Sequence, residues 1–170
     1  MADKSTFTPE EWKKLLASVL LTGMAVTMSD RSGLWGMMKE SFAGSSSMLA
    51  SDADAGANPI IKAVVADFKT SEGRSAARDE LKSVLAGATG AEAAQANAIG
   101  ALKNVAEILA AKAPDDAGAF TAFLNQVGEK TANASNEGGF LGFGGVAVSD
   151  AEKAALAQIA SALGGAPKAA

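Results

Sequence analysis

Apolar residues recur along this chain every three or four positions, which is the spacing of one face of a helix. The first helix has a complete start signal, because Thr8 suits the N-cap position and Glu11 stands at the third helical position, as in a capping box. Phe7 and Trp12 have the spacing of a hydrophobic staple. We therefore predict a helix over residues 9–28. Since this segment is apolar almost all round after Lys14, other helices should surround it.

Similar signals divide the rest of the chain into helices separated by turns of glycine, proline and small polar residues. The predicted helices lie at 34–43, from Pro59 to 68, from 74 to the segment GATG at 87–90, at 91–113, from a cap at Asp115 or Asp116 onward, and from a second capping box, Ser149 with Glu152, to 163. Their apolar faces are expected to contain Ile60, Ile61, Val64, Val65 and Phe68, then Leu81, Val84 and Leu85, then Ile99, Leu102, Val105 and Leu109, then Phe120, Phe123, Leu124 and Val127, and finally Leu156, Ile159 and Leu163.

These elements define the expected fold class. The β-like fragment at 146–148 is too short to form a sheet, so we expect an all-α protein, a compact bundle of six or seven helices with no sheet. Residues 1–164 are expected to form a single helical domain. Residues 165–170 are expected to be a disordered tail.

Composition and charge exclude several partners. The 170 residues are 48% apolar, which is enough for a substantial core, and the net charge of −4 comes from interspersed charges of both signs. Such a chain has no electrostatic footprint for nucleic acid or an anionic membrane. The longest apolar run, 15–28, is too short and too interrupted for a membrane span. The polar N-terminus does not resemble a signal peptide, so a cytoplasmic location is expected.

The chain contains no Cys, His or Tyr. This excludes disulfides, thiolate nucleophiles, Ser-His triads and metal sites built on histidine or cysteine. Any catalyst would have to be made from carboxylates, lysine, serine or a hard metal ion. We therefore expect a non-enzymatic protein with no cofactor and no metal.

Residues 137–150, EGGFLGFGGVAVSD, place Phe140, Leu141 and Phe143 among glycines. A phosphate-binding loop would need a preceding strand and phosphate ligands, which this segment lacks. Two interpretations remain open. The segment could fold back as a plug between the sixth and seventh helices, or it could wait for a partner as a docking loop.

A second apolar set occurs in the segment SGLWGMMKESF. Trp35, Met37 and Met38 could line a pocket for a hydrophobic ligand or adapt to a protein partner. Such a set more often belongs to the core.

The segment SDADAGAN, residues 51–58, partly matches a calcium loop. Asp52 and Asp54 occupy the first and third ligand positions, but the later positions carry residues that cannot supply the required glycine or glutamate. A solvated loop ahead of Pro59 is the favoured interpretation.

Two segments resemble known proteins: FTPEEWKKLLASVLLTGMAVTMSDRSG at 7–33 and EGGFLGFGGVAVSDAEKAALAQIASALG at 137–164. They are similar to the ends of a group of small, uncharacterised helical bacterial proteins, a resemblance that implies a fold and no activity. The C-terminal part is also similar to tellurite-resistance TerB-like domains, in which an acidic turn leads into a helix opened by Ser and Glu. Ser149, Asp150 and Glu152 match that helix start. Glycine-rich residues 142–145 replace the acidic turn.

Three functional hypotheses follow. The first is a non-enzymatic helical protein that acts through protein association, as a homodimer or an adaptor. The second is a carrier that holds a hydrophobic small molecule in the bundle interior. The third is a TerB-like stress-related protein with a carboxylate metal site. For the first two, the expected contact residues are those of the two apolar sets, Trp35, Met37, Met38, Phe140, Leu141 and Phe143.

Overall fold

A computed structural model describes residues 2–29, 58–137 and 148–164 of the chain. They form one turn of 3-10 helix, η1 (Lys4–Thr6), and the α-helices α1 (Pro9–Ser29), α3 (Pro59–Phe68), α4 (Ser71–Leu85), α5 (Ala91–Lys112), α6 (Pro114–Glu137) and α7 (Asp150–Ala162). These described residues include no strand, which confirms the prediction of an all-α bundle. The helix expected at 34–43 and the tail expected at 165–170 lie outside them.

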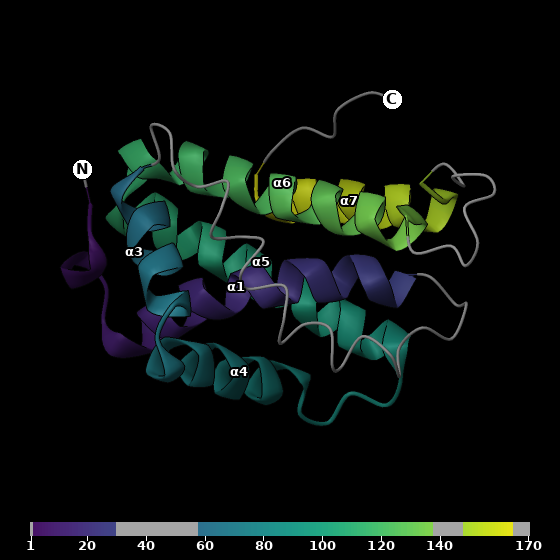
Figure 1. The fold of residues 1–170 in the computed structure, drawn as a ribbon, viewed down its shortest axis with the longest axis horizontal. Helices are drawn as coiled ribbons and strands as arrows, with labels where there is room; N and C mark the ends of the chain where they lie inside the picture. The colour runs from purple at the N-terminus through teal and green to yellow at the C-terminus, as the bar shows by residue number, and fades with distance from the viewer. Residues whose placement is uncertain (1, 30–57, 138–147, 165–170) are drawn as a thin grey trace.

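Helix α1 lies in the middle of the bundle (Figure 1). It contacts α3, α4, α5, α6 and α7, and α6 and α7 run side by side along one side of it. Its consecutive residues Leu15, Leu16, Ala17, Ser18 and Val19 are all buried, so its burial extends all round the axis. The expectation that other helices surround this segment is confirmed. Across the described ranges, no helix combines the length and the apolar content needed to cross a membrane.

Two features let the neighbouring helices pack closely around α1. The buried hydroxyls of Ser18 and Thr22 donate to carbonyl oxygens of their own helix, at 2.6 and 2.8 Å, so they bring no unsatisfied polar group into the core. On α6, Gly128 faces this region, and a Cβ there would lie 3.4 Å from Thr22 Cγ2 and 3.0 Å from Leu156 Cδ2. The missing side chain therefore allows α6 to approach both α1 and α7.

The predicted start of α1 is confirmed in detail. The backbone N–H of Thr8 donates to Glu11 Oε2 at 2.7 Å, and the N–H of Glu11 donates to Thr8 Oγ1 at 3.2 Å, which completes the capping box. The Phe7 and Trp12 rings lie 5.9 Å apart between centroids, and both are buried. The staple thus fixes the direction in which the N-terminal segment enters the helix.

Helix α4 begins three residues earlier than predicted, at Ser71 rather than after 73. The Thr70 hydroxyl caps it by accepting the N–H of Gly73 at 2.9 Å. Glycine at 73 is read from sequence as a helix breaker, but in the fold it lies in the first turn of α4. There it packs on the last turn of α3, where a Cβ would lie 2.2 Å from the Asp67 carbonyl oxygen.

The prediction that Asp115 or Asp116 caps α6 is wrong. The helix begins at Pro114, and both aspartates lie inside its first turn. Proline suits the first helical position because its fixed φ matches the helix and its missing N–H would be unpaired there in any case. One residue, Ala113, therefore separates α5 from α6.

The other predicted ends agree with the structure. Asn58 caps α3 by accepting the N–H of Ile60 at 2.8 Å, and Ser149 and Glu152 form the second capping box at the start of α7. Just after α7, Gly164 has φ +78°, a left-handed conformation that favours glycine.

The predicted apolar faces contribute to one core cluster, with differences in depth. The five apolar positions of α3 are all buried. By contrast, Leu81, Val84, Leu85, Ile99, Phe123 and Leu156 are only half-buried. In α4 the buried positions are Gly73 and Ala77, because this peripheral helix approaches its neighbours through small residues and leaves its larger side chains at the edge of the contact.

Candidate functional site

The contact residues predicted from the sequence, Trp35, Met37, Met38, Phe140, Leu141 and Phe143, lie outside the described residues, as do Asp52 and Asp54. The described part of 137–150 includes Val148, which is half-buried and packs against the core cluster. The choice between plug and docking loop therefore stays a prediction. Among the described residues, no group of three or more acidic side chains is placed to hold a metal ion.

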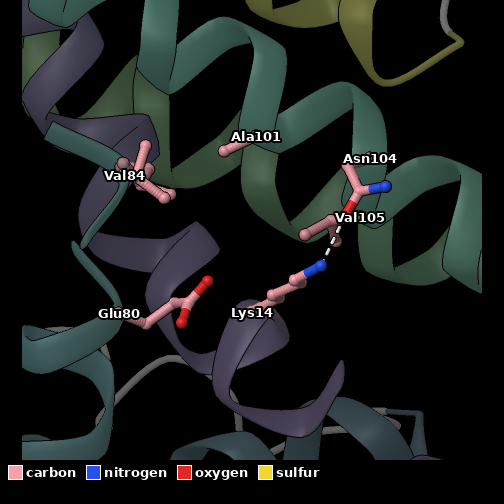
Figure 2. Close-up of a pocket in the computed structure, with 7 residues that line it drawn as sticks. Lys14, Glu80, Val84, Ala101, Asn104 and Val105 are labelled. Atoms are coloured by element: carbon pink, nitrogen blue, oxygen red, sulfur yellow. Dashed lines mark hydrogen bonds between the residues drawn. The ribbon is translucent and has the colours of Figure 1, made fainter. Parts of the chain in front are cut away.

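The structure does form a recess where α1, α4 and α5 meet (Figure 2). Its volume is about 180 Å³. The lining comprises Lys14 and Leu21 from α1, Glu80 and Val84 from α4, and Ala101, Asn104 and Val105 from α5. The recess has an apolar floor and a polar rim.

The floor of the recess is made of apolar side chains of different sizes. Leu21 and Val105 are almost completely buried and form its base, while Val84 and Ala101 are half-buried at its sides. Ala101 presents only a methyl group to the space. We therefore expect a longer side chain at this position to reduce the recess.

The rim carries two opposite charges that are not paired with each other. Lys14 reaches from α1 toward α5, and its ammonium donates to Asn104 Oδ1 at 3.1 Å (Figure 2). Glu80 extends from α4 at the other side of the Lys14 stem. It is half-buried and forms no hydrogen bond or ion pair with any residue that the structure describes. The lysine is thus engaged, and within this part of the chain the carboxylate has no donor.

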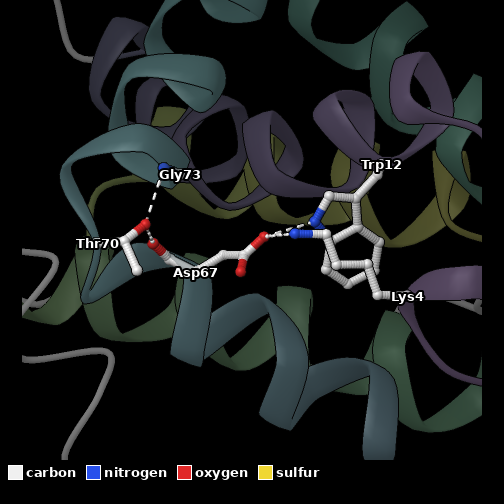
Figure 3. A network of polar contacts seen from close by, with 5 residues as sticks. All are labelled: Lys4, Trp12, Asp67, Thr70 and Gly73. Atoms are coloured by element: carbon white, nitrogen blue, oxygen red, sulfur yellow. Dashed lines mark hydrogen bonds and ion pairs between the residues drawn. The ribbon is translucent and has the colours of Figure 1, made fainter.

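A second polar cluster lies where η1, α1 and α3 meet (Figure 3). Asp67, at the end of α3, accepts from Trp12 Nε1 and from Lys4 Nζ, each at 2.7 Å. The Lys4 ammonium also lies 5.6 Å from the centre of the Trp12 ring, a cation–π distance. Thr70 donates its hydroxyl to the Asp67 carbonyl at 2.8 Å. This cluster fastens η1 to α1 and α3, and its donors and acceptors are used within the fold.

Asp116 performs a similar task on the other side of the N-terminal segment. It is 5% exposed, and its two carboxylate oxygens accept from the backbone N–H of Ala2, at 2.6 Å, and from the side-chain amide of Asn58. One carboxylate in the first turn of α6 therefore holds both the N-terminal segment and the cap of α3. Asp116 is therefore a structural residue.

An ion pair joins the start of α1 to the end of α5. Lys112 Nζ lies 2.6 Å from Glu11 Oε2. The Lys112 ammonium, and next the backbone N–H of Thr8, hold the pKa of Glu11 below its ordinary range. Glu11 is consequently a stabilising anion of the capping box.

The recess has no clear counterpart in the sequence. There, Lys14 only marks the point after which the first helix becomes apolar, and Val84 is one of the expected core positions. A weak signal was present, because the pair Gly100 and Ala101 interrupts the larger apolar residues of α5 with small ones. Without knowledge that α4 crosses α5 at this level, that signal has no interpretation.

Comparison of the chain with models of known families, with curated proteins and with solved structures gave no match. A function can therefore be inferred only from the sequence and the structure of the chain itself.

Proposed function

We propose that this protein acts through association with another protein, as an adaptor or a homodimer, and not as an enzyme. The observation that carries the proposal is the recess at α1, α4 and α5. It combines an apolar floor, charged groups at its mouth and a volume of about 180 Å³.

The size of the recess favours a side chain over a carried molecule. Pockets that enclose drug-sized ligands are on the order of 300–1,000 Å³, whereas an apolar cavity of about 150 Å³ holds a molecule the size of benzene. The recess therefore suits one large side chain. Protein interfaces commonly place such an anchor in a fitted pocket, surrounded by polar contacts that exclude water.

The apolar sets in the sequence supply further expected contacts for the same function. Phe140, Leu141 and Phe143, and likewise Trp35 with Met37 and Met38, are residue types enriched at association surfaces. A cytoplasmic location belongs to this proposal. The TerB-like alternative receives no support from Ser149 and Glu152, since capping of α7 accounts for both.

The test is a substitution that places a larger side chain in the recess. Ala101→Leu should close the space and abolish association, with the helical content and the melting temperature preserved. Ala110→Leu adds the same volume at an exposed position of α5 and is the matched control. Analytical ultracentrifugation over a wide concentration range measures self-association, and cross-linking followed by mass spectrometry in an extract of the source cells measures other partners.

Association that Ala101→Leu removes and Ala110→Leu keeps would support the proposal. The proposal would be overturned if the protein were a monomer at every concentration and if the unmodified chain and both variants gave the same cross-linked proteins. Native mass spectrometry of the purified protein addresses the carrier hypothesis, because a carrier should retain unexplained additional mass. The double variant Phe140→Ser/Phe143→Ser separates the interpretations of residues 137–150, since a plug would lose stability and a docking loop would lose association.

A further inference from the structure

We infer that the side chain received by the recess is an arginine of the partner protein, with its aliphatic stem on the apolar floor and its guanidinium on Glu80. This inference rests on the proposed function and names the chemistry of the partner at the same site. It follows from the charge left at the mouth, from the shape of the floor and from the geometry of the acceptor.

Glu80 differs from the other carboxylates that lie near buried structure. Asp67 and Asp116 each accept from two N–H groups supplied by other elements. Glu11 accepts from the N–H of Thr8, at the start of its own helix, and from the ammonium of Lys112 in α5. Glu80 is half-buried, yet it has no donor and no ion-pair partner among the described residues. When a carboxylate is partly removed from water and has no partner, binding of a cation stabilises its charge. The Glu80 end of the recess, and not the end at the Lys14 ammonium, is thus complementary to positive charge.

The neighbouring lysine does not satisfy this charge. Lys14 directs its ammonium to the amide oxygen of Asn104, on the α5 side of the recess (Figure 2). No ion pair joins it to Glu80 in the structure, although both residues are described and line the same space. The Lys14–Asn104 contact instead closes one end of the recess and leaves Glu80 to define the other.

The floor suits the stem of a long cationic side chain. Leu21, Val84, Ala101 and Val105 offer only hydrocarbon to the space between the two polar ends. Arginine and lysine bury their methylene stems along such surfaces while the charged head stays at the edge. Arginine fits better than lysine, because a planar guanidinium can donate two parallel hydrogen bonds to one carboxylate and is more weakly hydrated than an ammonium.

The experiment uses the full chain and a small probe, N-acetyl-L-arginine methylamide, followed by amide NMR shifts. The matched probe is the citrulline analogue, which has the same length and shape without the charge. The arginine probe should give saturable shifts centred on Val84, Ala101 and Val105. The citrulline probe should bind about two- to fivefold more weakly, as expected when a partly exposed ion pair is lost.

Two variants assign the contact. Glu80→Gln should reduce affinity for the arginine probe to the citrulline level, while Glu72→Gln, at an exposed position of the same helix, should leave it unchanged. Equal shifts with both probes, or unchanged affinity in Glu80→Gln, would overturn the inference. The absence of any saturable shift near the recess would also overturn it.

The failures of the two proposals can be told apart. If association is lost in Ala101→Leu but the arginine probe does not bind, the recess is an association site with another occupant and this inference is wrong. If the probe binds through Glu80 but association does not depend on Ala101, the occupant chemistry is supported and the proposed function is wrong.

Discussion

Gly73 provides the sharpest quantitative test of the packing. A Cβ at this position would lie 2.2 Å from the carbonyl oxygen of Asp67 and 2.6 Å from its carbonyl carbon. Both are backbone atoms, and the oxygen is held in place by the N–H and the hydroxyl of Thr70, at 2.9 and 2.8 Å. The substitution Gly73→Ala therefore cannot be accommodated by a rotamer change. The junction of α3 and α4 has to open.

The sign of the effect follows from two opposing contributions. Replacing glycine by alanine in a helix stabilises it by at most about 1 kcal/mol. Overpacking of a close contact costs about 1–3 kcal/mol, and a contact this short belongs at the upper end. We expect a net loss of about 2 kcal/mol, which for a domain of this size corresponds to a fall in Tm of about 4–8 °C.

Gly100→Ala is the matched control, since Gly100 lies inside α5 and a Cβ there would meet nothing within 4 Å. It should raise the free energy of unfolding by up to about 1 kcal/mol through helix propensity alone. Thermal unfolding followed by circular dichroism measures both variants. If Gly73→Ala melted at or above the temperature of the unmodified chain, the close approach of α4 to α3 would be wrong.

Three further predictions concern the polar contacts. Asp116→Ala should lower the free energy of unfolding in urea by about 1–3 kcal/mol, because two donors lose their acceptor, whereas the exposed Asp115→Ala should have little effect; equal losses would contradict the assignment. Ser149→Ala should lower stability by about 1 kcal/mol through loss of the α7 cap, measured by thermal unfolding, and an unchanged Tm would refute that role. The Glu11–Lys112 pair should stabilise the fold above the ordinary glutamate pKa, and this contribution should disappear as the pH falls through the lower pKa of the folded state. Denaturation at neutral and acidic pH should therefore show a difference between the unmodified chain and Glu11→Gln that shrinks in acid; a constant difference would disprove the linkage.

Interactions between neighbours in sequence were predictable. The two capping boxes, Thr8 with Glu11 and Ser149 with Glu152, involve residues three apart, so the donor and acceptor meet as soon as the first helical turn forms. The predicted start of α4 was wrong because it was judged from local helix propensity alone. Gly73 has the propensity of a helix breaker, but its need to lack a side chain arises from the Asp67 carbonyl in the preceding helix.

Contacts between distant residues had no counterpart in the sequence pattern. Trp12 and Asp67 are 55 residues apart, and Ala2 and Asp116 are 114 apart, yet each pair forms one hydrogen bond. In the sequence Asp116 is an acidic residue at a helix start, with the same appearance as the exposed Asp115 beside it. Burial separates their roles, and burial depends on which helices cross above them.

Local patterns along the chain were sufficient for the all-α class, the central position of the first helix, most helix boundaries and the exclusion of histidine and cysteine chemistry. Periodicity, capping and composition can each be recognised in a few neighbouring residues. Helix packing was needed to establish that Val84, Ala101 and Leu21 enclose a recess and that Lys14 turns to Asn104. It also leaves Glu80 without a donor among the described residues. Those properties are set by the crossing of three helices, since a space between side chains exists only after the helices that bound it have packed.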